Sequence, residues 1–299
     1  MTSDGTTPAE PGHTTGHTAG GADSAGRPWA GRSFHHHDTA YAGDDGSAPQ
    51  GYLDAVAALV AGTAGRAGVV DALRRQRLLV PLLAEAGETG VDERGRTVDK
   101  TQELSIVTVA GPDGGAILPM FSHVAAMQAW NPKARPVPTG VDRAAAAALD
   151  GPSRVVVDPG SPSEFVLDRT MLEALLTDAS WSWGVEDAAV QAAVLDALFA
   201  EPAVQAVVLA TADPRCRLAG AELEVHALVA AAPDDAAAGD DVATQVQRAA
   251  GRIGQADAVR ARIASLAVRM HRWDGGAAQL PLVSPAVLAL TRADWARQS

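Results

Sequence analysis

Short apolar segments of strand length, separated by turns and by helical segments, are the feature that most constrains the fold of this chain. The first five lie at residues 78–83, 104–109, 116–121, 155–157 and 165–167. Each is rich in leucine or in β-branched residues, as is typical of a buried strand. Stretches with the three-to-four-residue apolar spacing of a helix lie between them. This alternation predicts an α+β protein.

Turn and cap residues set the boundaries of these elements. Residues 111–115 read Gly-Pro-Asp-Gly-Gly and join the second and third strands into a hairpin. Pro81 lacks a backbone N–H, which predicts an edge strand or a bulge for the first strand. Ser122 is predicted to cap a helix ending at Trp130, and Asp168 to cap the helix that follows the last of these strands.

The second half of the chain repeats strands and helices in another order. We predict a helix at residues 185–199, strands at 206–210 and 223–231, an acidic loop at 233–241, a helix at 242–253 and a strand or helix end within 263–270. This order predicts a small antiparallel sheet covered on one face.

Composition separates a tail from the folded part. Residues 1–50 are rich in glycine, threonine, serine, histidine and aspartate, with few aliphatic side chains to offset the entropy of ordering. We expect this tail to be disordered and dispensable for folding. A chain of 299 residues suits two further domains, predicted at 51–178 and 179–299. The predicted fold is two small α/β modules with mixed or antiparallel sheets behind the tail.

Charge limits the classes of partner. The formal net charge is -12, and the only lysines are Lys100 and Lys133. Nucleic acids and anionic membranes bind clusters of basic residues, so we expect neither as a partner. No signal peptide and no apolar span of membrane length is apparent, which predicts a cytoplasmic protein.

Metal and cofactor motifs are not found in the sequence. A single cysteine, Cys216, excludes a disulfide framework and a cysteine-rich zinc site. The histidines at 35–37 lie in the tail, where adjacent side chains are not preorganised around one ion. No phosphate-binding loop or catalytic signature occurs. We therefore expect no metal site and no cofactor.

Cys216 is the main indication of an enzyme. It lies between Arg215 and Arg217, and neighbouring positive charge lowers a thiol pKa. A nucleophile also needs an oriented base, and His226 and His271 are equally well explained as packing or surface residues. We predict that the protein is not an enzyme, with catalysis through Cys216 as the alternative.

Four residues at element ends form the candidate binding site: Phe121, Trp130, Arg135 and Asp158. Aromatic, guanidinium and carboxylate groups that converge suit a peptide or a small acidic ligand. The structural alternative is that Phe121 and Trp130 belong to the core and that Arg135 pairs with Asp158.

The order of these motifs resembles the SseB N-terminal domain in its actinobacterial form. The motifs are Leu-Leu-Val-Pro-Leu-Leu (78–83), Ile-Val-Thr-Val (106–109), a Pro-Asp-Gly turn, Leu-Pro-Met-Phe-Ser (118–122), Trp130, Ala-Arg-Pro-Val-Pro (134–138) and Val-Val-Val-Asp-Pro (155–159). The chain departs from the family pattern at Met120, His123 and Asp158.

The resemblance implies an α/β domain and supplies no catalytic residues. We therefore predict a non-catalytic cytoplasmic binding or interaction protein whose partner is another protein or a small ligand. A secretion-associated role, which the family name alone suggests, is a second alternative.

Overall fold

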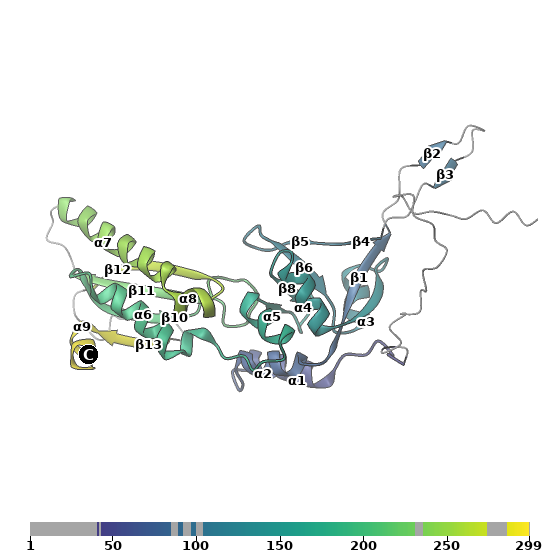
Figure 1. Cartoon of the computed structure of the whole chain (residues 1–299), viewed down its shortest axis with the longest axis horizontal. Helices are drawn as coiled ribbons and strands as arrows, with labels where there is room; N and C mark the ends of the chain where they lie inside the picture. The colour runs from purple at the N-terminus through teal and green to yellow at the C-terminus, as the bar shows by residue number, and fades with distance from the viewer. Residues whose placement is uncertain are drawn as a thin grey trace, which may run out of the picture. The chain divides into compact units, whose positions relative to one another are not determined.

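The computed structural model describes residues 41, 43–84, 89–91, 97–99, 104–230, 236–273 and 286–298 (Figure 1). Most of the predicted tail lies outside these residues. Residues 43–49 do not behave as a tail, because the carbonyl of Gly46 accepts the N–H of Val124 at 2.9 Å and the carbonyl of Ser47 accepts Arg77 at 2.7 Å. These two contacts join Gly46 and Ser47 to the folded part, and the domain boundary at residue 50 stays a prediction.

The predicted elements of the first half are present, and the α+β class is confirmed. The observed elements of this half are α1 (Gln50–Val60), α2 (Arg66–Leu73), β1 (Arg77–Ala84), β2 (Thr89–Val91), β3 (Thr97–Asp99), β4 (Leu104–Ile106), β5 (Val109–Ala110), β6 (Ala116–Met120), α3 (Val124–Trp130), β7 (Arg135–Gly140), α4 (Val141–Leu149), β8 (Val155–Val157), β9 (Phe165–Leu167) and α5 (Arg169–Leu176). The predicted strand at 104–109 is divided, because β4 pairs with β1 whereas β5 pairs with β6.

Two sheets form around one core in this half. One is antiparallel with the order β4-β1-β7, and the other has the order β5-β6-β8-β9, in which β6 and β8 run parallel. Helices α1, α2, α4 and α5 bury Tyr52, Val69, Ala145 and Met171 in a single cluster against one face of the second sheet. The opposite face carries a smaller cluster that includes Val156.

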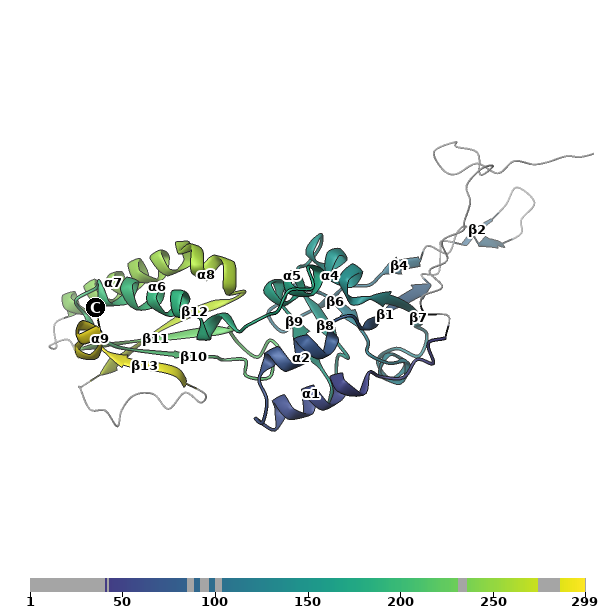
Figure 2. The ribbon, with the colours of Figure 1, turned by 60° about the horizontal axis from the view of Figure 1, so that its bottom comes forward.

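The second half forms a four-stranded sheet with helices on one side (Figure 2). Its elements are the 3-10 helix η2 (Gly184–Glu186), α6 (Ala188–Phe199), β10 (Val204–Ala210), β11 (Leu223–Ala230), α7 (Ala236–Gln255), α8 (Asp257–Arg262), β12 (Leu266–Trp273), β13 (Ala286–Thr291) and α9 (Arg292–Gln298). The strand order is β12-β11-β10-β13.

Two expectations for this half are corrected. The sheet is mixed rather than antiparallel, because β12 runs parallel to β11 after the two-helix connection through α7 and α8. Residues 236–241, predicted as part of an acidic loop, form the first turns of α7, since the alanines of this stretch have high helix propensity.

The connection between β10 and β11 reaches into the core of the first half. The carbonyl of Cys216 accepts the N–H of Val166 in β9 at 2.7 Å, and the Cys216 side chain belongs to the same buried cluster as Tyr52. The division at residues 178 and 179 remains a prediction. Among the helices that the structure describes, none has the length and hydropathy needed to cross a membrane.

β1 is the central strand of its sheet although it contains Pro81, which corrects the expectation of an edge strand or bulge. Leu79 exchanges backbone hydrogen bonds with Phe121 at 2.7 and 2.9 Å. Alternate residues of β1, including Pro81, therefore direct their backbone groups away from β7. Pro81 and Pro136 form a non-hydrogen-bonded pair of the antiparallel ladder. The missing N–H groups of the two prolines therefore cost no hydrogen bond between β1 and β7.

The same register directs two prolines to the unpaired outer edge of β7. Pro136 and Pro138 alternate with the residues that bond to β1, so their backbone nitrogens face the free edge of the sheet. Proline has no N–H to donate to an added strand. Strand addition at this edge is therefore disfavoured by sequence.

Replacing both Pro136 and Pro138 by threonine should make the protein self-associate, because it restores two N–H donors and strengthens strand propensity. Sedimentation equilibrium would measure the association, with Pro132→Thr in the preceding turn as the matched control. An unchanged molar mass for the double variant at millimolar concentration would show that another feature closes this edge.

Candidate functional site

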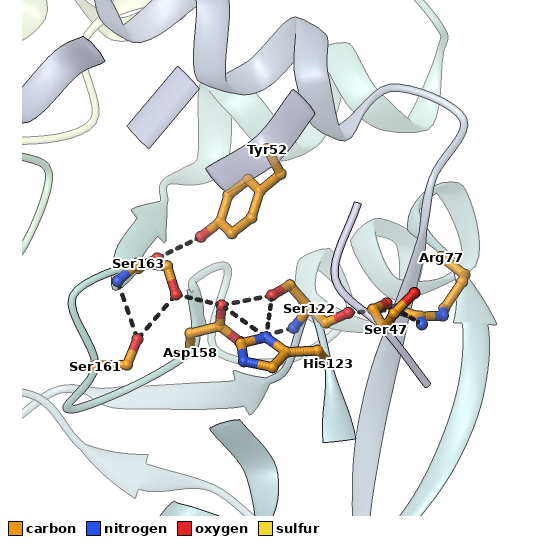
Figure 3. A network of polar contacts seen from close by, with 8 residues as sticks. All are labelled: Ser47, Tyr52, Arg77, Ser122, His123, Asp158, Ser161 and Ser163. Atoms are coloured by element: carbon orange, nitrogen blue, oxygen red, sulfur yellow. Dashed lines mark hydrogen bonds and ion pairs between the residues drawn. The ribbon is translucent and has the colours of Figure 1, made fainter. Parts of the chain in front are cut away.

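A buried carboxylate, Asp158, organises the polar network in Figure 3. Its side chain has no solvent exposure, and its φ of 52° lies in the left-handed region that aspartate tolerates better than most residues. Oδ1 accepts the N–H of Ser122 at 2.7 Å. Oδ2 accepts the hydroxyls of Ser122 at 2.6 Å and of Ser163 at 2.7 Å. Three donors thus offset the cost of burying this group.

Strand topology brings Ser122 to Asp158. Ser122 lies just beyond the end of β6 and Asp158 follows β8, and parallel strands place their carboxyl ends at the same edge of a sheet. The N–H of Asp158 donates to the carbonyl of Met120 at 2.9 Å and extends the pairing by one residue. Ser122 is therefore not the predicted N-cap of α3, whose cap position is His123 and has no side-chain cap.

The network also holds α1 and the loop between β8 and β9. The Tyr52 hydroxyl in α1 donates to the carbonyl of Ser163 at 2.7 Å. Burial, with a further contribution from Asp158, raises the pKa of Tyr52 well above its usual value, so the hydroxyl remains a donor. Ser161 bonds to Ser163 through its hydroxyl, at 3.0 Å from the Ser163 hydroxyl and 3.1 Å from its N–H.

The hydrogen bonds of Ser122 indicate which ring nitrogen of His123 carries a proton. The Ser122 hydroxyl donates its only proton to Asp158, yet it lies 2.8 Å from His123 Nδ1. Nδ1 must therefore donate to the Ser122 oxygen. In the neutral ring this leaves Nε2, the nitrogen turned away from Ser122 in Figure 3, as a hydrogen-bond acceptor.

Ser122, His123 and Asp158 do not have the geometry of a catalytic triad. A triad places the histidine between the other two groups, with one ring nitrogen for each. Here the same nitrogen, Nδ1, lies 2.8 Å from Ser122 and 3.8 Å from Asp158. Ser122 is also fully buried, so its hydroxyl is not accessible to a substrate. The network positions segments of the chain instead.

A groove of about 710 Å³ lies beside the network, and we call it the α1–α3 groove. Its walls are Leu53, Val56, Ala57, Val60 and Ala61 from α1 and Ala125, Ala126 and Ala129 from α3, and one end is formed by His123, Ser161, Pro162 and Ser163. Ala57, Ala125 and Ala129 are exposed, so the walls lie at the surface. The groove is apolar except where it meets the network.

The structure pairs two of the four residues of the candidate site predicted from sequence, and it does not pair Arg135 with Asp158. Phe121 is fully buried and half-buried Trp130 packs on it, with ring centroids 5.4 Å apart. Arg135 is exposed on β7 and makes no ion pair with Asp158, whose carboxylate is bound by serines instead. The structural alternative is therefore right for Phe121 and wrong for the pairing of Arg135 with Asp158.

Sequence reasoning did not identify the groove. The signal that was available is a set of alanines spaced three to four residues apart, at 125, 126 and 129, opposite an exposed Val60 on α1. His123 was noted only as a departure from the family pattern.

Cys216 does not have the properties expected of a nucleophile. Burial raises its pKa to about 12, outweighing the opposing effect of Arg66, so the thiol is neutral at physiological pH. The expectation of a lowered pKa from Arg215 and Arg217 is wrong, because the side chain turns into the core rather than toward those charges. The alternative of an enzyme that uses Cys216 loses the feature on which it rested.

Asp158→Gly should destabilise the protein by about 3 kcal/mol, because three buried donors lose their acceptor even though glycine relieves the backbone. Asp158→Asn should cost less, about 1–2 kcal/mol, since an amide oxygen still accepts and asparagine tolerates a positive φ. Urea unfolding would measure both values. If the glycine variant were as stable as the wild type, the backbone conformation and not the carboxylate would explain Asp158.

One comparison with known proteins identifies part of the chain. Residues 52–174 match the family model of the SseB protein N-terminal domain, a range that includes Tyr52, Ser122, Asp158 and Ser163. No significant match was found among curated proteins or among solved structures. This match confirms the predicted resemblance to the SseB N-terminal domain for residues 52–174, whereas the actinobacterial form stays a prediction.

Proposed function

We propose that the protein is a non-catalytic cytoplasmic binding protein that takes an amphipathic helix of another protein into the α1–α3 groove. The observation that carries this proposal is an apolar surface groove of about 710 Å³ with hydrogen-bonding groups at one end only. Its volume lies within the range of specific binding sites, roughly 300–1,000 Å³. The cytoplasmic location rests on the sequence alone.

The walls suit a helix rather than a long flexible side chain. Alanines at 57, 125 and 129 allow the backbone of a partner to approach closely, and alanine loses no rotamer freedom when it is covered. An apolar helix face laid between two helices is a common mode of peptide recognition. The surface loses less entropy on binding because the Asp158 network already fixes one of its ends.

The polar end of the groove suggests the orientation of the bound helix. The first turn of any helix carries N–H groups without intrahelical partners. His123 Nε2 is an acceptor in the neutral ring, and the ring lines the groove. We therefore propose that the N-terminal turn of the partner helix lies at His123.

Arg135 and Trp130 form a second candidate surface for binding another protein. Arg135 is exposed, and its guanidinium makes no ion pair with the described residues. Trp130 is half-buried and ends the preceding helix. Interface energy concentrates in Arg and Trp, which supports them as anchors. The proposal for the groove and the proposal for this surface predict different sensitive residues.

Peptides selected from a random display library should carry an apolar helical stripe and should lose binding in Ala129→Glu, which places a charge in the groove. Gln128→Glu changes the neighbouring exposed position on α3 that does not line the groove, and it should bind as the wild type does. Fluorescence anisotropy would measure the affinities, and we expect a loss of about tenfold or more.

The competing surface gives the opposite result. Selected peptides that bind Ala129→Glu normally but bind Arg135→Ala weakly, with folding intact, would move the site to Arg135 and Trp130. Failure to select any peptide that binds the wild type would contradict a peptide-binding role for either surface.

A further inference from the structure

A second, smaller cavity lies away from the α1–α3 groove and has a different chemistry. Its volume is about 260 Å³, and it lies where the connection after β10 meets the start of α5 and the residues that join α8 to β12. The charged side chains that line it are Arg66, Arg154, Arg169, Asp168, Asp213 and Glu222.

The three arginines of this cavity are already engaged. Their partners are Thr211 and the Asp213 carbonyl for Arg66, Asp113 for Arg154, and Glu173 for Arg169. Arg66 also lies over the ring of Trp183, 4.3 Å from its centroid. The carboxylate of Asp213 accepts two backbone N–H groups, from Arg217 and Leu218, both at 2.8 Å. These groups therefore help to build the wall of the cavity.

Two carboxylate oxygens remain without partners. Glu222 is only 6% exposed, and its Oε2 accepts the N–H of Ala264 at 2.7 Å while the buried Oε1 has no hydrogen bond. Asp168 caps α5 through Oδ1, which accepts from Thr170 and Met171. No hydrogen bond reaches its Oδ2 from the described part of the chain. The unpartnered oxygen of buried Glu222 is costly and indicates a missing donor, and half-buried Asp168 can supply a second acceptor.

The electrostatics are consistent with a missing positive charge. Burial, and then the repulsion of Asp168, raises the pKa of Glu222 to about 7. Ionised Glu222 is therefore poorly compensated by the protein itself, even with Arg66 nearby. A ligand that brought both charge and N–H donors would stabilise it.

We propose that this cavity binds a small organic cation with a primary ammonium group. The ammonium donates one N–H to Glu222 Oε1 and another to Asp168 Oδ2. Its short apolar stem lies against Val166, Met171 and Leu218, which also line the cavity. An organic cation fits better than a metal ion, because no group of three metal-ligating side chains occurs among the residues that the structure describes. This site is independent of the proposed helix groove.

Ethylammonium is a suitable probe, with ethanol as the neutral control of similar size and sodium chloride at equal ionic strength as the screening control. Titration followed by NMR at pH 8 should give saturable shifts for ethylammonium alone. Glu222→Gln should lower the affinity by about tenfold or more, because an amide lacks the charge that strengthens the hydrogen bond. Lowering the pH to 5.5 should weaken binding to the wild type as Glu222 takes up a proton.

Two further variants keep the test decisive. Asp168→Asn should also weaken binding while keeping the helix cap, since asparagine caps helices as well as aspartate does. Asp196→Asn removes the same charge from an exposed position on α6 and should leave the affinity unchanged. Equal shifts with sodium chloride, or affinities unchanged in both Glu222→Gln and Asp168→Asn, would overturn the proposal. If Glu222→Gln does not fold, Asp168→Asn alone decides between the outcomes.

Discussion

A buried carboxylate must be matched by donors, and the first half of this structure depends on how that requirement is met at Asp158. The three donors come from two parts of the chain, since Ser122 follows β6 and supplies two of them and Ser163 precedes β9. Tyr52 then ties α1 to the carbonyl of Ser163. Removing one partner from such a buried charge costs several kcal/mol, whereas each donor alone adds about 1 kcal/mol. The network therefore fixes three segments together.

Two strand edges in the first half are blocked against strand addition, whereas the surface between α1 and α3 forms a groove. The outer edge of β7 presents prolines, and β9 is bonded by the carbonyl of Cys216, so neither offers a ready ladder to another strand. The proposed partner surface is instead the α1–α3 groove. The Asp158 network forms one end of that space, which links a buried structural feature to a surface that can recognise a ligand.

Elements were predictable from the sequence because local patterns determine them. The apolar runs, the turn at 111–115 and the Asp168 cap all have short-range signals, and the structure contains each of them. Predictions failed where long-range pairing decides. Pro81 is tolerated in a central strand because Leu79 bonds to Phe121. Ser122 is not the cap because its N–H and hydroxyl are directed to Asp158 and α3 begins only at Val124. Neither partner can be inferred from neighbouring residues.

The candidate site shows the same limit. Phe121, Trp130, Arg135 and Asp158 were grouped because they lie at element ends, and the sequence could not indicate which ends meet. The register of β7 places Arg135 opposite Leu82, whereas the parallel pairing of β6 and β8 places Asp158 beside Ser122. The Cys216 thiol was judged by its sequence neighbours, although its pKa depends on the core into which its loop folds.

The N–H and the hydroxyl of Ser122 both donate to Asp158, and His123 therefore donates to the Ser122 oxygen through Nδ1. Nε2 of His123 is then the acceptor that faces the groove. Nitrogen-15 NMR of the imidazole ring reports the tautomer directly. The account predicts that the neutral His123 ring carries its proton on Nδ1 and that Nε2 is unprotonated. A neutral ring protonated on Nε2 would contradict it, because Ser122 would then have to donate to His123 and could not donate to Asp158.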